Sequence, residues 1–213
     1  YANELNRRGH QVDILCGFKK GDLIDTVDNG VRIINFQSRA RKFILPLITY
    51  LKKNQVDILY CGFRSYNCIG ILDKKIAKVS TCVYASQHGF QADGRIERLI
   101  KGRIIRHADH LIAVTQNVAD FEAKQMHIDI NKFTILNNPV LDENQSIRKE
   151  NHAWFEENIP IIAVCGRLAR DKGKKFCVEI LKKLNDSMPV RMLVLGDGPC
   201  LDECKQLAKS LHI

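Results

Sequence analysis

The stretch IIAVCGRLARDKGKKF, residues Ile161–Phe176, decides the fold of this chain. It begins as a continuous apolar run, ends that run at Gly166, and continues into a polar turn that carries Arg167 and Lys172. Continuously apolar runs of this length are typical of parallel strands that are covered on both faces. In an open parallel sheet, ligands bind beyond the carboxyl ends of the strands, where the next helix presents free N–H groups. The stretch therefore predicts a strand that delivers two cations to a ligand site.

Similar apolar runs recur along the chain, and helical patterns lie between them. This alternation predicts an α/β protein with doubly wound parallel sheets. The predicted strands are Val12–Cys16, Val31–Phe36, Val56–Cys61, Val79–Ala85, His110–Thr115, Lys132–Leu136, Ile161–Cys165 and Val190–Leu195. The predicted helices are Phe43–Lys53, Ile96–Arg106, Gln116–Lys124 and Lys175–Leu184.

The segment Asn137–Asn151 is polar, contains Pro139 and has no sustained period, which is typical of a linker between domains. We therefore predict a first domain at residues 1–142 and a second at residues 143–213. The second domain holds only strand, helix, strand, helix. Because two parallel strands rarely form a stable sheet alone, we expect this second domain to be incomplete.

Eight cysteines are scattered through the predicted strands and helices, without a C-x-x-C pair or a Cys/His cluster at zinc spacing. Cys200 and Cys204 lie four residues apart on one predicted helix, which suits packing better than bridging. We therefore expect reduced core thiols and a cytoplasmic location. The apolar runs are also far shorter than the roughly 18 to 20 residues of a membrane-spanning helix.

The formal net charge of +9 is concentrated in the first domain. Residues 1–142 carry 21 Lys and Arg against 14 Asp and Glu, whereas residues 143–213 carry 12 against 10. This balance predicts an anionic partner: nucleic acid, an anionic membrane face or a phosphorylated small molecule. Aromatic residues are few and are not interleaved with the basic ones, and no nucleic-acid-binding motif is present, which argues against RNA and DNA.

The polar turn around Arg167 and Lys172 allows two interpretations. An arginine fork and a lysine point charge in front of a helix can converge on a diphosphate. Alternatively, the turn is a solvated surface loop in which Arg170 pairs with Asp171. Charge spacing alone slightly favours the surface pair.

Five motifs, in order along almost the whole chain, resemble glycosyltransferase family 4, the retaining GT-B enzymes that use nucleotide-sugar donors. GRLARDKG resembles the family's GRL-x-x-x-KG signature, and LVLGDGPCLDEC resembles its GDGP strand and helix. ELNRRGHQVDIL resembles the first helix and second strand, ADHLIAVTQNV the AD-x-hydrophobic-AVS segment, and ILNNPV the hinge. The resemblance implies a GT-B architecture of two Rossmann-like domains.

By this resemblance, Gly166, Arg167 and Lys172 bind the donor diphosphate. The two cations would neutralise negative charge on the departing nucleotide. Because such electrostatic stabilisation needs no metal, we expect neither a metal nor another cofactor.

Four further positions are candidates. The family places a histidine like His88 beside the donor sugar and the acceptor, where it would orient the sugar or steady its charge, although such a residue is more often a loop histidine satisfied by backbone. Gly196 and Gly198 suit a tight turn into a helix, with a second interpretation that places them near the nucleotide. Asn138 is interpreted as a hinge and turn residue rather than a catalytic one.

Two segments alternate basic and apolar residues, RARKFILPLITYLKK and RIERLIKGRIIRH. Most helices of this kind simply cover a sheet. A further hypothesis is that these two helices bind the surface of a membrane that contains anionic lipids. Such binding suits an enzyme with a lipid-linked acceptor.

The chain also departs from the family pattern. The family's first strand and glycine-rich loop are expected before Tyr1, and no two glutamates are spaced as in the family's Glu-x7-Glu pair. We therefore expect a piece of a longer enzyme that transfers little or no sugar by itself.

The sequence thus predicts a glycosyltransferase that moves a hexose or N-acetylhexosamine from a UDP- or GDP-sugar to a cell-envelope polysaccharide or lipid-linked acceptor. Two alternatives stay open: a nucleotide-sugar epimerase of GT-B fold, and a non-catalytic scaffold.

Overall fold

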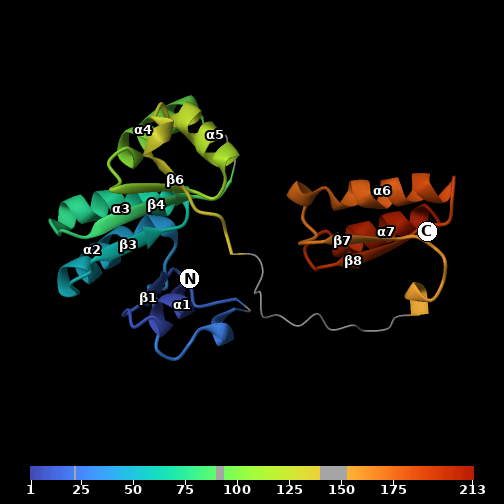
Figure 1. Ribbon diagram of the computed structural model, residues 1–213, viewed down its shortest axis with the longest axis horizontal. Coiled ribbons are helices and arrows are strands. Elements are labelled where there is room, and N and C mark those ends of the chain that lie inside the picture. Colours follow the sequence, from blue (N-terminus) through green and yellow to red (C-terminus); the bar gives the residue numbers. More distant parts are fainter. Residues whose placement is uncertain (22, 90–93, 140–152) are drawn as a thin grey trace. The chain divides into compact units, whose positions relative to one another are not determined.

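The computed structural model describes residues 1–21, 23–89, 94–139 and 153–213. The chain forms two compact units, Tyr1–Asp142 and Glu143–Ile213. Figure 1 shows that each unit consists of strands accompanied by helices. The predicted linker, Asn137–Asn151, lies mostly outside the described residues.

Strands and helices alternate along the chain, and all eight predicted strands and all four predicted helices are confirmed to within a few residues. The strands are β1 (Asp13–Cys16), β2 (Arg32–Asn35), β3 (Ile58–Cys61), β4 (Cys82–Gln87), β5 (His110–Ala113), β6 (Phe133–Ile135), β7 (Ile161–Cys165) and β8 (Arg191–Leu195). The helices are α1 (Ala2–Arg7), α2 (Ile44–Lys53), α3 (Arg64–Ala77), α4 (Arg95–Ile105), α5 (Gln116–Met126), α6 (Lys174–Asn185) and α7 (Leu201–Ser210).

All strand pairs are parallel, as predicted. In the first unit β1 pairs with β2, and β3, β4, β5 and β6 form a four-stranded sheet in chain order. In the second unit β7 pairs with β8. Parallel order brings the carboxyl ends of neighbouring strands to one edge, so the residues that follow β3 and β4, or β7 and β8, lie together.

The centre of the four-stranded sheet is fully buried. Val83 and Ala85 of β4 and Ala113 of β5 have no exposed surface, and Leu111 is almost as deeply buried. Helices α3 and α4 complete this core with Ile71 and Ile105. These four strand residues lie on one face of the sheet. On the other face, Ile112 of β5 is buried, but Tyr84 of β4 is half-buried and His110 of β5 is exposed, so the predicted cover on both faces is confirmed only in part.

Helix α3 was not predicted, because two polar residues interrupt its apolar stripe. Asn67 is 0% exposed and Asp73 is 1% exposed, so both are buried where an amphipathic pattern would have apolar residues. The helix ends at Lys78, which adopts a left-handed conformation with φ 56°. Because these two buried positions are polar, the apolar periodicity that would predict a helix is interrupted in α3.

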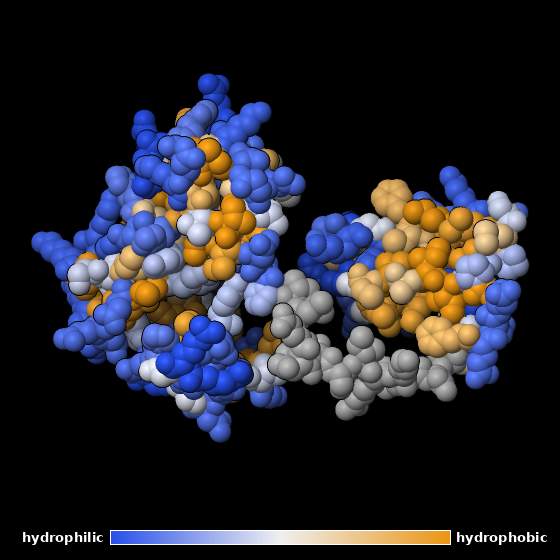
Figure 2. All heavy atoms as spheres, in the orientation of Figure 1, coloured by the Kyte–Doolittle hydropathy of each residue, from blue (hydrophilic) through white to orange (hydrophobic). Residues whose placement is uncertain are grey.

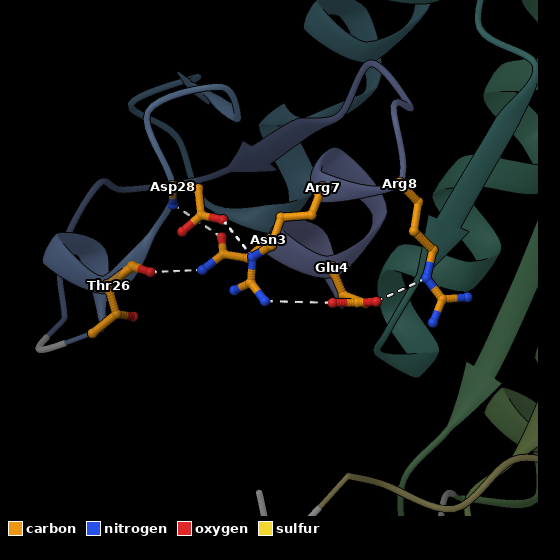
Figure 3. Close-up of polar contacts among 6 residues, drawn as sticks. All are labelled: Asn3, Glu4, Arg7, Arg8, Thr26 and Asp28. Carbon is orange, nitrogen blue, oxygen red and sulfur yellow. Dashed lines mark hydrogen bonds and ion pairs between the residues drawn. The ribbon is translucent and has the colours of Figure 1, made fainter. Parts of the chain in front are cut away.

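Helix α1 is held against the segment that precedes β2 (Figure 3). The Asn3 side chain donates to the Thr26 carbonyl at 2.7 Å and accepts from the Asp28 backbone N–H at 3.0 Å. Arg7 adds a 3.1 Å contact to the Asp28 carboxylate. These bonds satisfy the loop backbone and fix the entry into the β1–β2 pair.

The second unit differs from the expectation in one respect. Ala163 and Cys165, alternate residues of β7, are exposed, so one face of this strand is uncovered within the described residues. Val194 and Leu195 of β8 are exposed as well, and Figure 2 shows apolar side chains gathered on one side of this unit. The prediction that the continuous apolar runs are covered on both faces is therefore wrong for β7 and β8.

All eight cysteines are free, as expected. Burial raises the pKa of the Cys61 thiol to about 12, so this cysteine is inert at neutral pH. Cys165 is exposed at the end of β7 and is not a core thiol, which corrects the expectation for this position.

Candidate functional site

The turn after β7 brings the two predicted cations to one carboxylate. Gly166 follows the strand with φ 121°, a conformation that favours glycine, and Arg167 comes next. The Arg167 guanidinium lies 3.8 Å from one oxygen of Asp171, and the Lys172 ammonium lies 3.7 Å from the other. Both cations are more than half exposed, at 67% and 55%. The structure therefore places Arg167 and Lys172 where one small anion can contact both.

The surface-loop interpretation of the turn assumes an ion pair between Arg170 and Asp171. Within the described part of the chain, Asp171 forms its ion pairs with Arg167 and Lys172 rather than with Arg170. Exposed pairs at such distances contribute little to stability, on the order of 0 to 1 kcal/mol. The two ion pairs of Asp171 therefore add little to the stability of the turn.

The predicted glycines Gly196 and Gly198 lie beside this turn, because the loops after β7 and β8 pack closely. The Gly166 N–H donates to the Leu195 carbonyl at 2.9 Å. A Cβ atom on Gly196 would lie 2.3 Å from the Gly166 oxygen, and one on Gly198 would lie 2.4 Å from the Leu168 oxygen. The close approach of the two loops thus requires glycine at both positions. Their proximity to a nucleotide stays a prediction.

Leu168 packs the turn that carries Arg167 and Lys172 against the interior of the second unit. It is 1% exposed and packs on Cys200 and Cys204, with Val178 of α6 and Leu201 of α7 beside them. Its backbone N–H donates to the Asp197 carbonyl at 2.8 Å. The buried Leu168 side chain and this hydrogen bond hold the backbone of the turn between the exposed cations Arg167 and Lys172.

A third cation, Lys174, was missed by the sequence analysis. It is the first residue of α6, is only 8% exposed, and donates from Nζ to the Cys165 carbonyl at 2.9 Å. Helical spacing is the signal that could have found it, because Lys174 lies three and four residues before the stripe residues Cys177 and Val178. Position 174 therefore belongs to the face of α6 that turns inward.

His88 directly follows β4, at the carboxyl edge of the four-stranded sheet, as predicted. Its Nε2 lies 3.0 Å from the Ser86 hydroxyl. The Phe63 ring, which follows β3, has its centroid 6.3 Å from that of the imidazole. The His88 side chain is exposed at this edge of the sheet.

Buried polar side chains lie beneath His88, and the sequence analysis missed them too. Asn67 and Ser86 are 0% exposed, and Gln87 is 3% exposed. The Asn67 amide donates to the Ser86 carbonyl at 2.9 Å. This bond ties the start of α3 to the end of β4 and so steadies the backbone that carries His88.

Asn138 lies in the exposed segment after β6. Its neighbour Asn137 donates to the Val114 carbonyl at 3.1 Å and accepts a 3.1 Å bond from the Tyr1 hydroxyl. The chain is therefore fixed to the first unit up to Asn137. The hinge role of Asn138 stays a prediction.

An apolar groove of about 990 Å³ lies on the first unit, among α2, α3 and α4. Ile96 and Ile100 of α4 line it and are 75% and 56% exposed. Arg95 and Lys101 of the same helix border it. Helix α4 thus combines exposed isoleucines with basic side chains, as its sequence pattern predicts.

Among the described residues, no group of three or more His, Cys, Asp and Glu side chains is placed to hold a metal ion. The helices in this part of the chain are all too short or too polar to cross a membrane.

The structure is similar to solved glycosyltransferases over almost the whole chain. A glycosyltransferase from Rickettsia africae ESF-5 matches with a TM-score of 0.72 and 20% identity, over 99% of this chain and 60% of that one. Anabaena Alr3699/HepE in complex with UDP matches with 0.66 and 16%, over 95% and 66%. The lipopolysaccharide outer core galactosyltransferase WaaB, in its apo form, matches with 0.59 and 13%, over 94% and 56%. These likenesses show the GT-B type of α/β fold, and the chain spans between 56% and 66% of the length of these structures.

The family follows from the sequence. The profile described as Glycosyltransferase Family 4 matches residues 1–143. The chain therefore belongs to glycosyltransferase family 4, as its motifs predicted. No curated protein matches it by sequence. Arg167 and Lys172 lie outside the matched residues, so their roles stay predictions.

Proposed function

We propose that the protein transfers a hexose or N-acetylhexosamine from a UDP- or GDP-sugar to a cell-envelope polysaccharide or lipid-linked acceptor. One observation carries the proposal: Arg167 and Lys172 lie on either side of the Asp171 carboxylate, in the turn that follows β7, in a member of a glycosyltransferase family. That edge is where open parallel sheets bind their ligands. The UDP complex of the similar Anabaena protein supports a nucleotide-sugar donor.

In the proposed reaction, the bond between the anomeric carbon of the sugar and the diphosphate oxygen breaks, and the oxygen of an acceptor hydroxyl group forms the new bond to that carbon. The electron pair of the broken bond stays on the nucleoside diphosphate, and the proton of the acceptor hydroxyl passes to the leaving diphosphate or to water. The Arg167 fork and the Lys172 ammonium stabilise the negative charge that stays on the nucleotide, which lowers the barrier without a step that requires a metal. Gly166 lets the turn approach the phosphates closely. His88 orients the donor sugar or stabilises the charge that develops on it. Retention of the anomeric configuration is proposed from the family resemblance.

Product analysis of the whole protein separates this proposal from its alternatives. With a UDP- or GDP-sugar and an acceptor, we expect glycosylated acceptor and free nucleoside diphosphate to form together. An epimerase would isomerise the sugar with donor alone, and a scaffold would leave donor and acceptor unchanged. Isomerised donor in the absence of acceptor would therefore contradict the transferase proposal, as would no product in either reaction.

The second part of the proposal concerns location. We propose that the protein works in the cytoplasm and contacts the cytoplasmic face of a membrane through α4. The support is the groove-lining Ile96 and Ile100, which are largely exposed, beside the exposed basic residues Arg95 and Arg103. Apolar side chains flanked by basic ones bind the interface of anionic bilayers.

Vesicle co-sedimentation tests the membrane contact. We expect binding to vesicles that contain phosphatidylserine, and a loss of at least about tenfold in the variant Arg95→Gln/Arg103→Gln, because each basic residue near the surface contributes about 1 kcal/mol. The variant Lys124→Gln/Lys132→Gln removes the same charge from other exposed positions and is expected to bind like wild type. Equal absence of binding with anionic and neutral vesicles would remove the proposal.

A further inference from the structure

Lys174 carries a buried charge that the described residues do not neutralise. Its side chain is more than nine-tenths buried, yet its ammonium has a carbonyl, that of Cys165, as its hydrogen-bond partner at 2.9 Å. An ammonium has three donors and a full charge. Among the described residues, no carboxylate forms an ion pair with Lys174. A buried charge in this state is costly unless an anion comes close.

The position of the charge indicates where such an anion would lie. A Cβ atom on Gly166 would be 3.7 Å from Lys174 Nζ, so the ammonium lies directly beside the turn that carries Arg167. Lys174 also begins the twelve-residue helix α6, whose N-terminus has no side-chain cap. Free backbone N–H groups and the positive end of the helix dipole add to the potential there.

We propose that Lys174 is a third cation of the diphosphate site, placed beneath the Gly166 turn. The inference rests on the proposed function. Lys174 holds the Cys165 carbonyl and thereby the direction of the turn, and its charge attracts the bound diphosphate through the protein interior. Arg167 and Lys172, which are more than half exposed, contact the diphosphate from the solvent side.

The three cations differ in their response to salt. Screening by ions weakens exposed charges strongly and buried charges much less. The contribution of Lys174 to diphosphate binding is therefore expected to persist at high salt, whereas the contributions of Arg167 and Lys172 decline. A residue that only shaped the turn would affect nucleoside and nucleotide alike and would give no such charge-specific signature.

Calorimetric titration of the chain with UDP and with uridine tests the proposal, because only UDP carries the diphosphate. Lys174→Gln removes the charge but keeps an N–H donor. It is expected to weaken UDP binding on the order of tenfold at both low and high salt, and to leave uridine binding unchanged. Lys174→Arg keeps the charge and is expected to retain most of the UDP affinity. Lys175→Gln is the matched control, since Lys175 lies in the same first turn but is exposed and paired with Glu203 at 2.8 Å.

Three results would overturn this inference. The first is wild-type UDP affinity in Lys174→Gln, and the second is an equal loss of UDP and uridine binding in that variant. The third is an equal loss in Lys175→Gln. If Arg167→Ala weakens UDP binding while Lys174→Gln does not, this inference alone fails. If neither variant changes the binding of UDP or of GDP, the proposed function fails with it.

Discussion

Arg167→Ala is expected to weaken UDP or GDP binding by roughly 10- to 150-fold, which corresponds to about 1.5 to 3 kcal/mol for a lost charge-assisted contact. The guanidinium follows Gly166 at the carboxyl end of β7, and the anion it now faces is the Asp171 carboxylate at 3.8 Å. A diphosphate offers more charge and more oxygens to the same fork, so the loss should be confined to ligands that carry phosphate. Titration calorimetry with UDP, GDP and their nucleosides measures it.

Arg170→Ala is the matched control for this measurement. Arg170 is exposed in the same turn, three residues along the chain, and removing it lowers the net charge equally. It is expected to change UDP affinity by less than about threefold, the scale of an exposed charge. Equal affinities of wild type and Arg167→Ala would favour a scaffold that kept the fold without the phosphate site.

Asp73→Asn is expected to stabilise the first unit at alkaline pH by up to about 4 kcal/mol. Asp73 is 1% exposed, and neither of its carboxylate oxygens has a hydrogen-bond partner among the described residues. Burial raises the pKa of this carboxyl group to about 7 from its ordinary value of 3.8. The charged form is therefore the form that the fold disfavours.

The direction of the pH dependence follows from the raised pKa of Asp73. Below about pH 4, the carboxyl group is protonated in both the folded and the unfolded chain, and Asp73 has no effect on the pH dependence. Between about pH 4 and pH 7, the unfolded chain loses the proton while the folded chain keeps it, so the free energy of unfolding falls as pH rises. Above about pH 7 both states are charged, and the loss is constant.

Urea unfolding followed by circular dichroism at pH 4, 6 and 8 measures this effect. The difference between Asp73→Asn and wild type should grow with pH and level off above about pH 7. Fluorescence of Trp154, in the second unit, should be unaffected by the substitution. The exposed Asp57 serves as a control, because Asp57→Asn should leave the pH profile of wild type in place. A difference in unfolding free energy between Asp73→Asn and wild type that stays constant from pH 4 to pH 7 would contradict a buried, unpartnered Asp73.

Much of the fold could be predicted because the strands are apolar runs and the sheets are parallel. The strand predicted at Val79–Ala85 is found at Cys82–Gln87, since Ser86 and Gln87 are polar but buried and extend it. Helix α3 could not be predicted, because its buried Asn67 and Asp73 break the pattern that apolar periodicity relies on. A search for periodicity treats polar residues as exposed, and that assumption fails wherever tertiary packing buries them.

Of the candidate site, too, one part could be predicted from the sequence and another part could not. The place of Arg167 and Lys172 in the turn after a strand and a glycine could be predicted from the sequence, whereas their binding of a diphosphate came from the family resemblance and stays a prediction. The Asp171 carboxylate between them, and the Ser86 hydroxyl at His88, could not, since these contacts depend on side-chain directions that spacing does not fix. Lys174 was overlooked for a further reason: lysine is almost never fully buried, so its place on the inner face of α6 carried no weight.

The most direct test of the central claim is a crystal structure of the protein with UDP bound. The account predicts that diphosphate oxygens lie about 2.7 to 2.9 Å from the Arg167 guanidinium and the Lys172 ammonium, with the Asp171 carboxylate displaced from between them. A diphosphate bound elsewhere, with both cations still paired to Asp171, would contradict it.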